Sequence, residues 1–260
     1  MIRRVGVVAA AIVGIYLLLA LAFVVVQRRV IFPAPQGARP LPPGGTVVRG
    51  EGFVALDAPI AGARGTVALF HGNGEDLADA APMIGAWQAA GYSAFAIEYP
   101  GYGIARELGS PSENAILASA ERSLTWLRAQ AGRPATLVLQ GQSLGTAVAV
   151  EMAQRGFGER LVLISPFTSL ADMAQHVAPW LPTRLLLRDR FDTAAIAAQV
   201  QQTVLIVHGT ADEVVPVDMG IRLAALFPRV QLRLIRGGRH NDLLAVHGPA
   251  LRKALLSQAR

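Results

Sequence analysis

Six short runs of apolar, β-prone residues recur along the chain, and longer segments with helical periodicity separate them. The runs are nearly continuous in apolar residues, as expected for strands that helices cover on both faces. They lie at 66–70, 93–97, 136–140, 161–165, 204–208 and 231–235. This alternation predicts a mostly parallel sheet of the α/β class.

The segments between these runs predict the helices of the same domain. Helical periodicity is present at 77–90, 114–129, 144–154, 218–226 and 242–256. The first apolar run, 46–56, is more mixed and predicts an antiparallel hairpin at the sheet edge. We therefore assign residues 46–260 to one catalytic domain.

An uncharged apolar segment, residues 5–26, precedes this domain. As a helix at about 1.5 Å per residue it would extend roughly 33 Å, which is enough to cross a bilayer. A cleaved signal peptide is the alternative, because Ala20-Leu21-Ala22 resembles a cleavage site. The apolar run continues to Val26 and then meets Arg28 and Arg29, which favours an uncleaved transmembrane anchor.

Basic residues flank the anchor on both sides, within the basic N-terminus 1–4 and at Arg28 and Arg29. The two sides nearly balance, so the positive-inside rule does not set the orientation. A Pro/Gly-rich tether follows at 27–45, and together with the anchor it favours an extracytoplasmic domain, periplasmic in a bacterium.

The chain is basic, with 24 basic against 18 acidic residues, but this charge does not indicate nucleic-acid binding. Four of the arginines flank the anchor, and the catalytic domain is nearly neutral without them. All basic residues except Lys253 are arginine. Cysteine is absent, which excludes a catalytic thiol, disulfides and thiolate metal sites.

A serine between two glycines follows the third of the apolar runs, in the sequence Gly141-Gln142-Ser143-Leu144-Gly145. A strand that turns at once into a helix brings its backbone too close for side chains at positions 141 and 145. The turn lifts the serine hydroxyl above the sheet and leaves the amide of Leu144 at a helix N-terminus. This pattern predicts a nucleophile elbow with Ser143 as the nucleophile and Leu144 as one oxyanion donor.

A serine nucleophile needs a histidine base, and His240 is the candidate. It lies in a glycine-containing loop just after the last predicted strand, where it can reach the carboxyl edge of the sheet. His71 and His208 end strands and are expected to make local hydrogen bonds beside the site. His176 and His247 have no glycine turn beside them, and we expect neither to be catalytic.

The candidate acid is Asp212, four residues past a strand end. Such a residue is ordinarily a turn or cap residue, but the chain order serine, acid, histidine matches the order of this type of site. Glu213 is its nearest rival, and Asp172 and Asp189 are weaker rivals because neither directly follows a predicted strand.

A second oxyanion donor is expected in the loop after the first apolar strand, His71-Gly72-Asn73-Gly74. Small residues let backbone amides approach a ligand there, and the amide of Asn73 is the candidate. A glycine-rich turn alone is common in α/β proteins, so this assignment depends on the other site residues.

These motifs together resemble the α/β-hydrolase family, and within it the membrane-anchored α/β hydrolase domain-containing serine hydrolases. The resemblance covers nearly everything after residue 27. It also includes Tyr99-Pro100-Gly101-Tyr102-Gly103, Ser165-Pro166-Phe167-Thr168-Ser169, Leu187-Arg188-Asp189-Arg190-Phe191-Asp192 and Gly238-Arg239-His240-Asn241-Asp242. Pro100 stands where such enzymes usually carry arginine, and the segment 104–108 replaces a shorter turn.

The resemblance implies an esterase, lipase or thioesterase that acts on small or lipid-like acyl substrates without metal or cofactor. Residues 166–192 interrupt the strand-helix rhythm and either form a short cap over an apolar pocket or only pack against the sheet. A peptidase or amidase, and a non-catalytic binding module tethered to the membrane, are the alternatives. The oligomeric state stays open.

Overall fold

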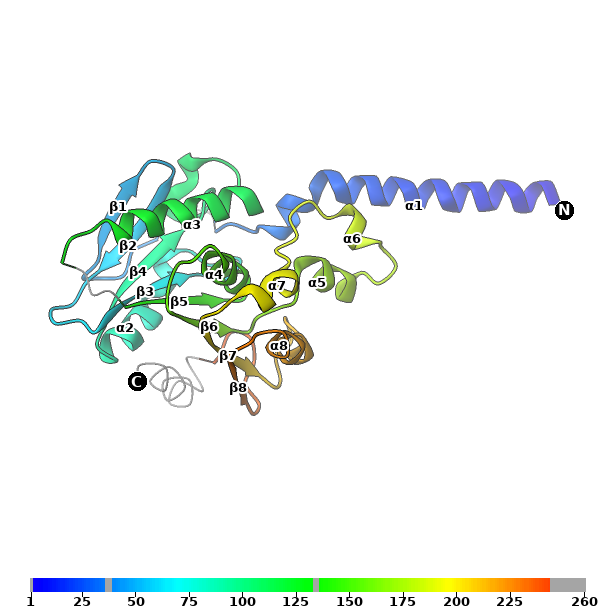
Figure 1. Cartoon of the computed structure of the whole chain (residues 1–260). Coiled ribbons are helices and arrows are strands. Elements are labelled where there is room, and N and C mark those ends of the chain that lie inside the picture. The colour runs from blue at the N-terminus through cyan, green and yellow to red at the C-terminus, as the bar shows by residue number, and fades with distance from the viewer. Residues whose placement is uncertain (1, 36–38, 133–135, 244–260) are drawn as a thin grey trace.

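The computed structural model describes residues 2–35, 39–132 and 136–243 of the chain. Within these ranges the chain forms an eight-stranded sheet with the order β1-β2-β4-β3-β5-β6-β7-β8 (Figure 1). The strands are β1 (Thr46–Gly50), β2 (Phe53–Ala58), β3 (Gly65–Phe70), β4 (Tyr92–Glu98), β5 (Leu137–Gln142), β6 (Arg160–Ile164), β7 (Thr203–Gly209) and β8 (Val230–Ile235).

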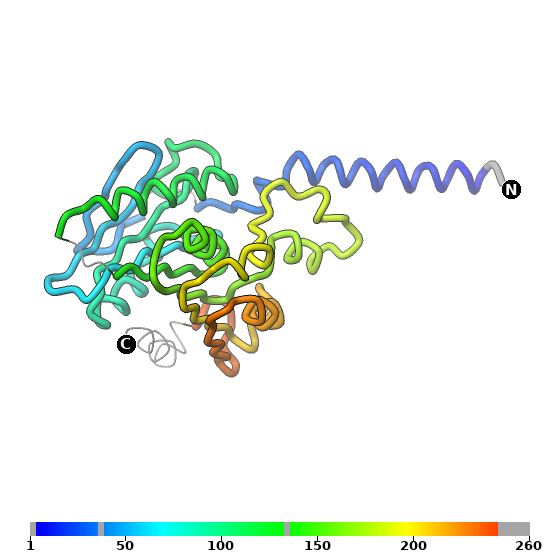
Figure 2. The backbone as a smooth tube through the Cα atoms, in the orientation of Figure 1, coloured from blue at the N-terminus to red at the C-terminus, as the bar shows by residue number. Residues whose placement is uncertain are grey.

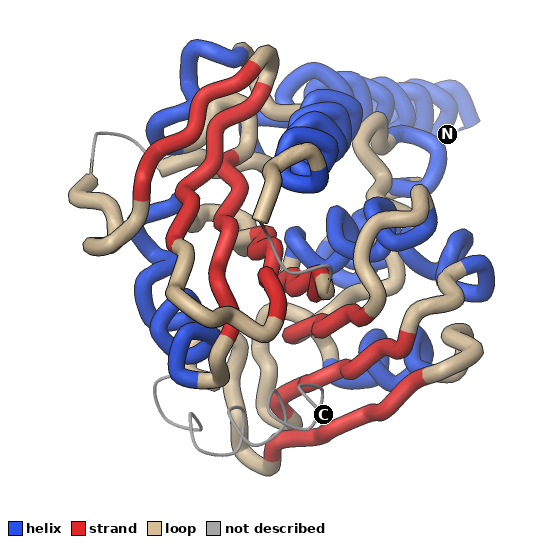
Figure 3. Tube along the Cα trace, turned by 60° about the vertical axis from the view of Figure 1, so that its left-hand side comes forward, coloured by secondary structure: helices blue, strands red, loops and turns tan. Residues whose placement is uncertain are grey.

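The sheet is parallel except at the edge formed by β1 and β2. β2 pairs antiparallel with both β1 and β4, and every later neighbouring pair is parallel. The predicted hairpin and the six predicted strands are thus confirmed. Figure 3 shows that the strand direction rotates across the sheet, which is the usual twist.

Helices cover both faces of the sheet, as the continuous apolar runs predict. The helices that pack on the strands include α2 (Ala81–Ala89), α3 (Glu113–Arg128), α4 (Leu144–Gln154) and α8 (Val217–Ala224). The predicted helix 77–90 is divided into a 3-10 turn, η1 (Leu77–Ala80), and α2. Pro82 has no amide hydrogen and therefore sits in the first turn of a new helix. The predicted helix 242–256 lies almost wholly outside the described residues.

Side chains that alternate along each strand fill two cores. Leu139 and Leu163 pack with α3 and α4 in the first core, which also contains α8 residues. The residues just before them, Val138 and Val162, pack in the second core with Trp87 of α2. A parallel strand that is buried on both faces therefore needs apolar residues at consecutive positions.

The N-terminal helix α1 (Ile2–Ile31) projects from the domain (Figures 1 and 2). It is long and apolar enough to cross a membrane by length and composition. It continues through Gln27 and Arg28 to Ile31, past Val26 where the sequence places the end of the anchor. The next residue, Phe32, is buried in the first core of the domain.

Between β6 and β7 the chain forms three short helices. They are α5 (Leu170–Val177), α6 (Thr183–Leu186) and α7 (Thr193–Ile196), followed by the 3-10 turn η3 (Ala197–Gln199). A further 3-10 segment, η2 (Gly103–Leu108), follows β4. The helices α5 and α6 pack on each other, and α6 lies beside α1 (Figure 1).

Candidate active site

Ser143 occupies the sharp turn between β5 and α4. Its φ of 49° and ψ of −116° are unusual for a residue other than glycine, and its amide donates to the Ile164 carbonyl at 2.9 Å. A Cβ atom on Gly141 would lie 2.1 Å from the Gly145 oxygen. A Cβ on Gly145 would lie 2.1 Å from the Phe70 oxygen. The backbone crowding expected of a nucleophile elbow is therefore present.

Four of the five residues predicted for the site line one cavity of about 410 Å³, and the fifth, Asp212, contacts the lining residue His240. Ser143 and Leu144 line it from the elbow, Asn73 from the loop after β3, and His240 from the loop after β8. The amide of Leu144 lies at the N-terminus of α4, and among the described residues neither it nor the amide of Asn73 has a backbone or side-chain acceptor. Two free amides beside a serine suit an oxyanion.

Asp212 and His240 form a close pair. The ring Nδ1 of His240 lies 2.9 Å and 3.0 Å from the two carboxylate oxygens of Asp212. A carboxylate only accepts, so Nδ1 carries the proton and Nε2 has a free lone pair. Within the described chain neither His240 Nε2 nor Ser143 Oγ makes a hydrogen bond. The hydrogen bond between a serine nucleophile and its histidine base is often long or unformed when no substrate is bound.

The Asp212 carboxylate is buried and receives further donors. Its Oδ1 accepts from the amides of Val214 at 3.0 Å and Val215 at 2.8 Å. Burial alone would raise the pKa of Asp212. Hydrogen bonds from His208, His240 and the Val215 amide outweigh burial, so the pKa lies far below its usual range. The acid is thus ionised at any working pH.

His208 is fully buried at the end of β7, beside the acid. Its Nε2 lies 3.0 Å from the Val215 carbonyl and 3.3 Å from Asp212 Oδ2. Both neighbours are acceptors, so Nε2 carries the proton and is shared between them. The local hydrogen bonding expected of His208 is present, and the ring is a second histidine contact of Asp212 beside His240.

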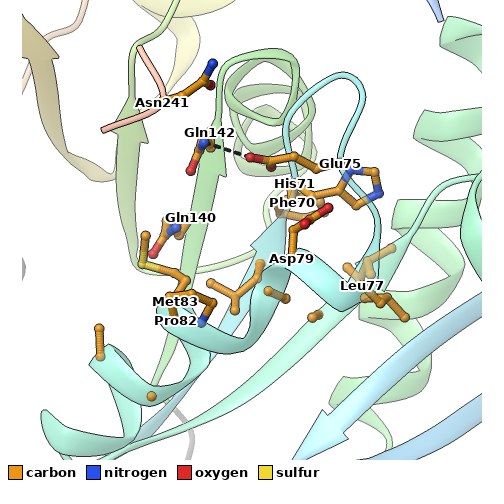
Figure 4. Close-up of a pocket in the computed structure, with 16 residues that line it drawn as sticks. Phe70, His71, Glu75, Leu77, Asp79, Pro82, Met83, Gln140, Gln142 and Asn241 are labelled. Atoms are coloured by element: carbon orange, nitrogen blue, oxygen red, sulfur yellow. Dashed lines mark hydrogen bonds between the residues drawn. The ribbon is translucent and has the colours of Figure 1, made fainter. Parts of the chain in front are cut away.

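The loop 71–74, which contains the candidate oxyanion donor Asn73, is held by contacts with several segments. Glu75 accepts from the Gly72 amide at 2.6 Å and from Gln142 Nε2 at 3.0 Å, so one carboxylate ties the loop to the elbow (Figure 4). The Asn73 side chain accepts from the Tyr102 hydroxyl at 2.7 Å and donates to the Ile31 carbonyl of α1. The loop geometry thus depends on three distant segments.

His71 begins the same loop and is not part of the cavity wall around Ser143. Its Nδ1 lies 2.9 Å from the Gly72 carbonyl, and its Nε2 lies 3.1 Å from Glu98 Oε1. Burial is the largest single effect and lowers the pKa of His71. The hydrogen bonds to Glu98 and the Gly72 carbonyl and the charges of Glu98 and Glu75 together outweigh it, so the pKa is raised. The local hydrogen bonding expected of His71 is present here as well.

A second cavity of about 590 Å³ lies on the other side of Glu75 (Figure 4). It shares Glu75, Gln142 and Asn241 with the first cavity, but neither Ser143 nor His240 lines it. We therefore place the reacting groups in the smaller cavity. Among the described residues no group of histidines and carboxylates could hold a metal ion.

The alternative candidates for the acid and the base make other contacts or lie on other elements. Glu213 is exposed and pairs with Arg239 at 3.1 Å. Asp172 pairs with Arg184, and Asp189 pairs with Arg28 of α1. His176 is exposed on α5, and His247 lies outside the described residues.

Sequence reasoning missed the supporting residues of the site. These are Glu75, Glu98, Tyr102 and Gln142, and for His208 the contact with the acid. Glu98 directly precedes the motif Tyr99-Pro100-Gly101-Tyr102-Gly103, and Tyr102 lies within it, but the motif itself indicates no role for either side chain. Contacts between residues far apart in the chain leave no local signal, so Glu75 and Gln142 could not have been paired from the sequence.

Comparison with known proteins gives a consistent result. Residues 61–192 match the family described as serine aminopeptidase, S33. An uncharacterised protein of Mycobacterium tuberculosis is 34% identical over 243 residues, which cover 88% of this chain and 85% of the relative. Alpha/beta hydrolase domain-containing protein 17B of Homo sapiens is 32% identical over 187 residues, which cover 70% and 62%.

Solved structures share the fold. An esterase of Pyrococcus furiosus superposes with a TM-score of 0.69 at 15% identity, over 87% of this chain and 95% of the esterase. A monoacylglycerol lipase of Paleococcus ferrophilus superposes with a TM-score of 0.61 at 18% identity, over 80% of this chain and 98% of the lipase. At these identities the likeness establishes the architecture alone.

Proposed function

This chain belongs to the serine aminopeptidase, S33, family of α/β hydrolases, and on that premise we propose that it is a membrane-anchored serine esterase or thioesterase. The observation that carries the proposal is the buried Asp212–His240 pair, which opens onto the same cavity as Ser143 and two free amides. A binding module would not require an oriented histidine with a free Nε2 beside a strained serine.

The reaction is acyl transfer in two halves. His240 Nε2 takes the Ser143 proton as Oγ attacks the acyl carbon, and the amides of Asn73 and Leu144 hold the oxyanion. His240 then returns the proton to the departing alkoxide or thiolate. Water, activated by the same Nε2, releases the acid and restores the serine.

Lipid-like or acylated substrates fit the cavity and the chain. The wall of the cavity beside Ser143 includes the apolar side chains Phe167, Leu170, Met173 and Val215, which suit an acyl chain. Two of the structural neighbours are named as an esterase and a monoacylglycerol lipase. α1 would keep the domain at a membrane surface, on the extracytoplasmic side.

The family description names an aminopeptidase, and the site argues against that reaction for this chain. An aminopeptidase needs a free acidic group to bind the substrate ammonium. Among the described residues that line the cavity the only carboxylate is Glu75, and each of its oxygens already accepts one hydrogen bond, from the Gly72 amide and from Gln142 Nε2, which leaves it fewer acceptor positions for an ammonium. Ester hydrolysis has no such requirement.

The test uses the full-length protein in detergent with a fluorophosphonate probe and intact mass. We expect one covalent adduct on the wild type and none on Ser143→Ala. Ser112→Ala, which alters only the cap of α3, is the matched control and should keep the adduct. A folded wild type that stays unlabelled would refute serine catalysis and favour the binding module.

Substrate class is decided with the same preparation. We expect turnover of acyl esters or thioesters, with longer chains preferred over acetate, and no release from aminoacyl anilides. Turnover of aminoacyl anilides alone would overturn the esterase proposal and support the peptidase.

A further inference from the structure

Three large apolar side chains are exposed at the outer end of the α5–α6 region. Val177 is 78% exposed, Trp180 59% and Leu185 84%. We call these three residues the cap tip. They belong to three successive segments, the end of α5, the following loop and α6. Exposed apolar groups gathered at one end of a domain mark a contact surface.

One member of the cap tip, Trp180, contacts the apolar part of α1. The Tyr16 hydroxyl donates to the Trp180 carbonyl at 3.3 Å, and the two rings meet edge to face at 6.4 Å. Tyr16 lies twelve residues before Arg28, which is about 18 Å along a helix. The contact is therefore well inside the apolar segment 5–26, and not at its polar end.

Polar contacts fix this arrangement nearer the domain. Gln27 Nε2 donates to the Leu186 carbonyl at 3.2 Å, and the Arg188 amide donates to Gln27 Oε1 at 2.8 Å. Arg28 Nε donates to Asp189 Oδ2 at 2.7 Å. Any membrane that surrounds α1 up to Arg28 therefore meets the cap tip as well (Figure 1).

The charges around the base of the cap suit the polar edge of a bilayer. Three arginine side chains are exposed there, namely Arg29, Arg188 and Arg190, while Arg184, next to Leu185, is ion-paired with Asp172. Long arginine side chains extend toward lipid headgroups while their stems stay in apolar surroundings, and anionic headgroups attract them.

The same helix connects the cap tip with the reacting serine. Leu170 and Met173 of α5 line the cavity that contains Ser143, and Val177 ends that helix at the cap tip. Spacings of three and four residues place these side chains along one face of α5. An apolar strip thus leads from the exposed end of the cap to the cavity.

We propose that the cap tip enters the membrane beside α1 and is the entrance through which an acyl chain passes from the bilayer to Ser143. The proposal rests on the membrane-anchored hydrolase proposed above and names the source of its substrate, a lipid or lipid-modified chain still embedded in the bilayer. The partner is the lipid phase itself, because the patch is continuous with the apolar helix α1.

The first test measures the depth of the cap tip in the membrane. The chain has no cysteine, so Leu185→Cys gives a single labelling site for an environment-sensitive fluorophore. The full chain is placed in phosphatidylcholine–phosphatidylglycerol vesicles that carry nitroxide on the acyl chains. Leu18→Cys in α1 reports the anchor, and Ile221→Cys on α8, 44% exposed, is the control outside the membrane.

We expect blue-shifted emission and nitroxide quenching at Leu185→Cys and Leu18→Cys, and neither at Ile221→Cys. Quenching at Leu18→Cys with a solvent-exposed signal at Leu185→Cys would overturn the entrance and leave the anchor intact. No quenching at either position would refute the anchor and the entrance together. Serine labelling by fluorophosphonate reports separately on the hydrolase.

A second measurement addresses the passage of substrate. The triple change Val177→Ser, Trp180→Ser and Leu185→Ser should lower the ratio of kcat/KM for a vesicle-embedded ester to that for a soluble short-chain ester by about tenfold or more. Ile221→Ser, a matched exposed apolar residue, should leave the ratio unchanged. An unchanged ratio in the triple variant, with normal melting, would overturn the proposal.

Discussion

Asp212 receives more hydrogen bonds than the orientation of one histidine requires. Two backbone amides donate to Oδ1, and the rings of His240 and His208 both lie close to Oδ2. Its pKa in the folded protein is depressed, so its contribution to stability is present above the usual value of 3.8 and is lost as the pH falls through the lower folded value. The acid stays charged throughout the range in which histidine titrates.

Replacement of Asp212 should therefore affect catalysis far more than replacement of its neighbour. We expect Asp212→Asn to lower kcat by about 10³–10⁴-fold, because an amide can leave the His240 ring in the wrong tautomer. Glu213→Gln is the matched control, since Glu213 is exposed and contacts Arg239 and only the backbone amide of His240, which an amide oxygen can still accept, and it should stay within a few-fold of wild type. Steady-state hydrolysis of a soluble ester measures both, and equal losses would contradict the assignment.

His71 should make stability depend on pH. Burial opposes the imidazolium, but Glu98 raises the folded pKa of His71 above its usual 6.5. The stabilisation of the fold by charged His71 is fully present below the unfolded pKa of 6.5, and it is lost as the pH rises through the higher folded pKa. We expect the melting temperature in detergent to fall between pH 6 and pH 9, and to fall less in Glu98→Gln. Identical slopes in both proteins would refute the charged pair.

Single residues differ in how far the sequence reveals them. Ser143, Asp212 and His240 each follow a strand in the predicted order, so parallel strands bring them to one edge of the sheet. The role of Glu75 depends on Gly72 and Gln142 lying side by side. That juxtaposition arises only when β3 and β5 pair, and no local pattern encodes it.

At the scale of elements, strands were predictable because both faces are buried. β6 and β7 consist almost entirely of apolar residues, and their observed ends lie within a residue of the predicted ones. Helix ends were less predictable. α1 continues past Val26 because Gln27 and Arg28 find partners on the cap, and these partners lie some 160 residues away in the sequence.

The elbow should tolerate no side chain at its second glycine. In Gly145→Ala the new Cβ would meet the Phe70 carbonyl, and we expect a loss of about 1–3 kcal/mol in stability with weaker probe labelling. Gly85→Ala, in the exposed middle of α2 with nothing within 4 Å, should gain about 0.5–1 kcal/mol. Thermal melting measures the change in stability of each variant. An unchanged stability of Gly145→Ala would contradict the close approach of position 145 to the Phe70 carbonyl.

At the scale of the whole molecule, α1 and the catalytic domain share a polar joint. The buried Asp189 carboxylate accepts from Arg28 at 2.7 Å and from the Glu113 amide at 2.9 Å. The joint links the last turns of α1, the cap and the start of α3. The sequence predicted a Pro/Gly-rich tether without regular structure from residue 27 onward, and this contact between distant segments explains why its first residues, up to Ile31, are helical.

Loss of the arginine should weaken this joint. We expect Arg28→Gln to cost about 1–2 kcal/mol, because it leaves a buried carboxylate short of one partner, and solvent around the half-exposed arginine limits the effect. Arg29→Gln is the control, since Arg29 makes no ion pair within the described part of the chain. The melting temperature in detergent and the rate of protease cleavage near residue 40 are measured for both variants. Equal values for Arg28→Gln and Arg29→Gln would contradict a stabilising contact between Arg28 and Asp189.

The hydrogen bond from Asn73 to the Ile31 carbonyl has a practical consequence for anyone who purifies this enzyme. Removal of the apolar helix is the obvious route to a soluble preparation. That step also removes one of the two groups that hold the Asn73 side chain, and it leaves the Tyr102 hydroxyl as the other. Rate constants from such a trimmed preparation would describe an altered oxyanion loop, and inhibitors selected against it would be matched to the wrong pocket.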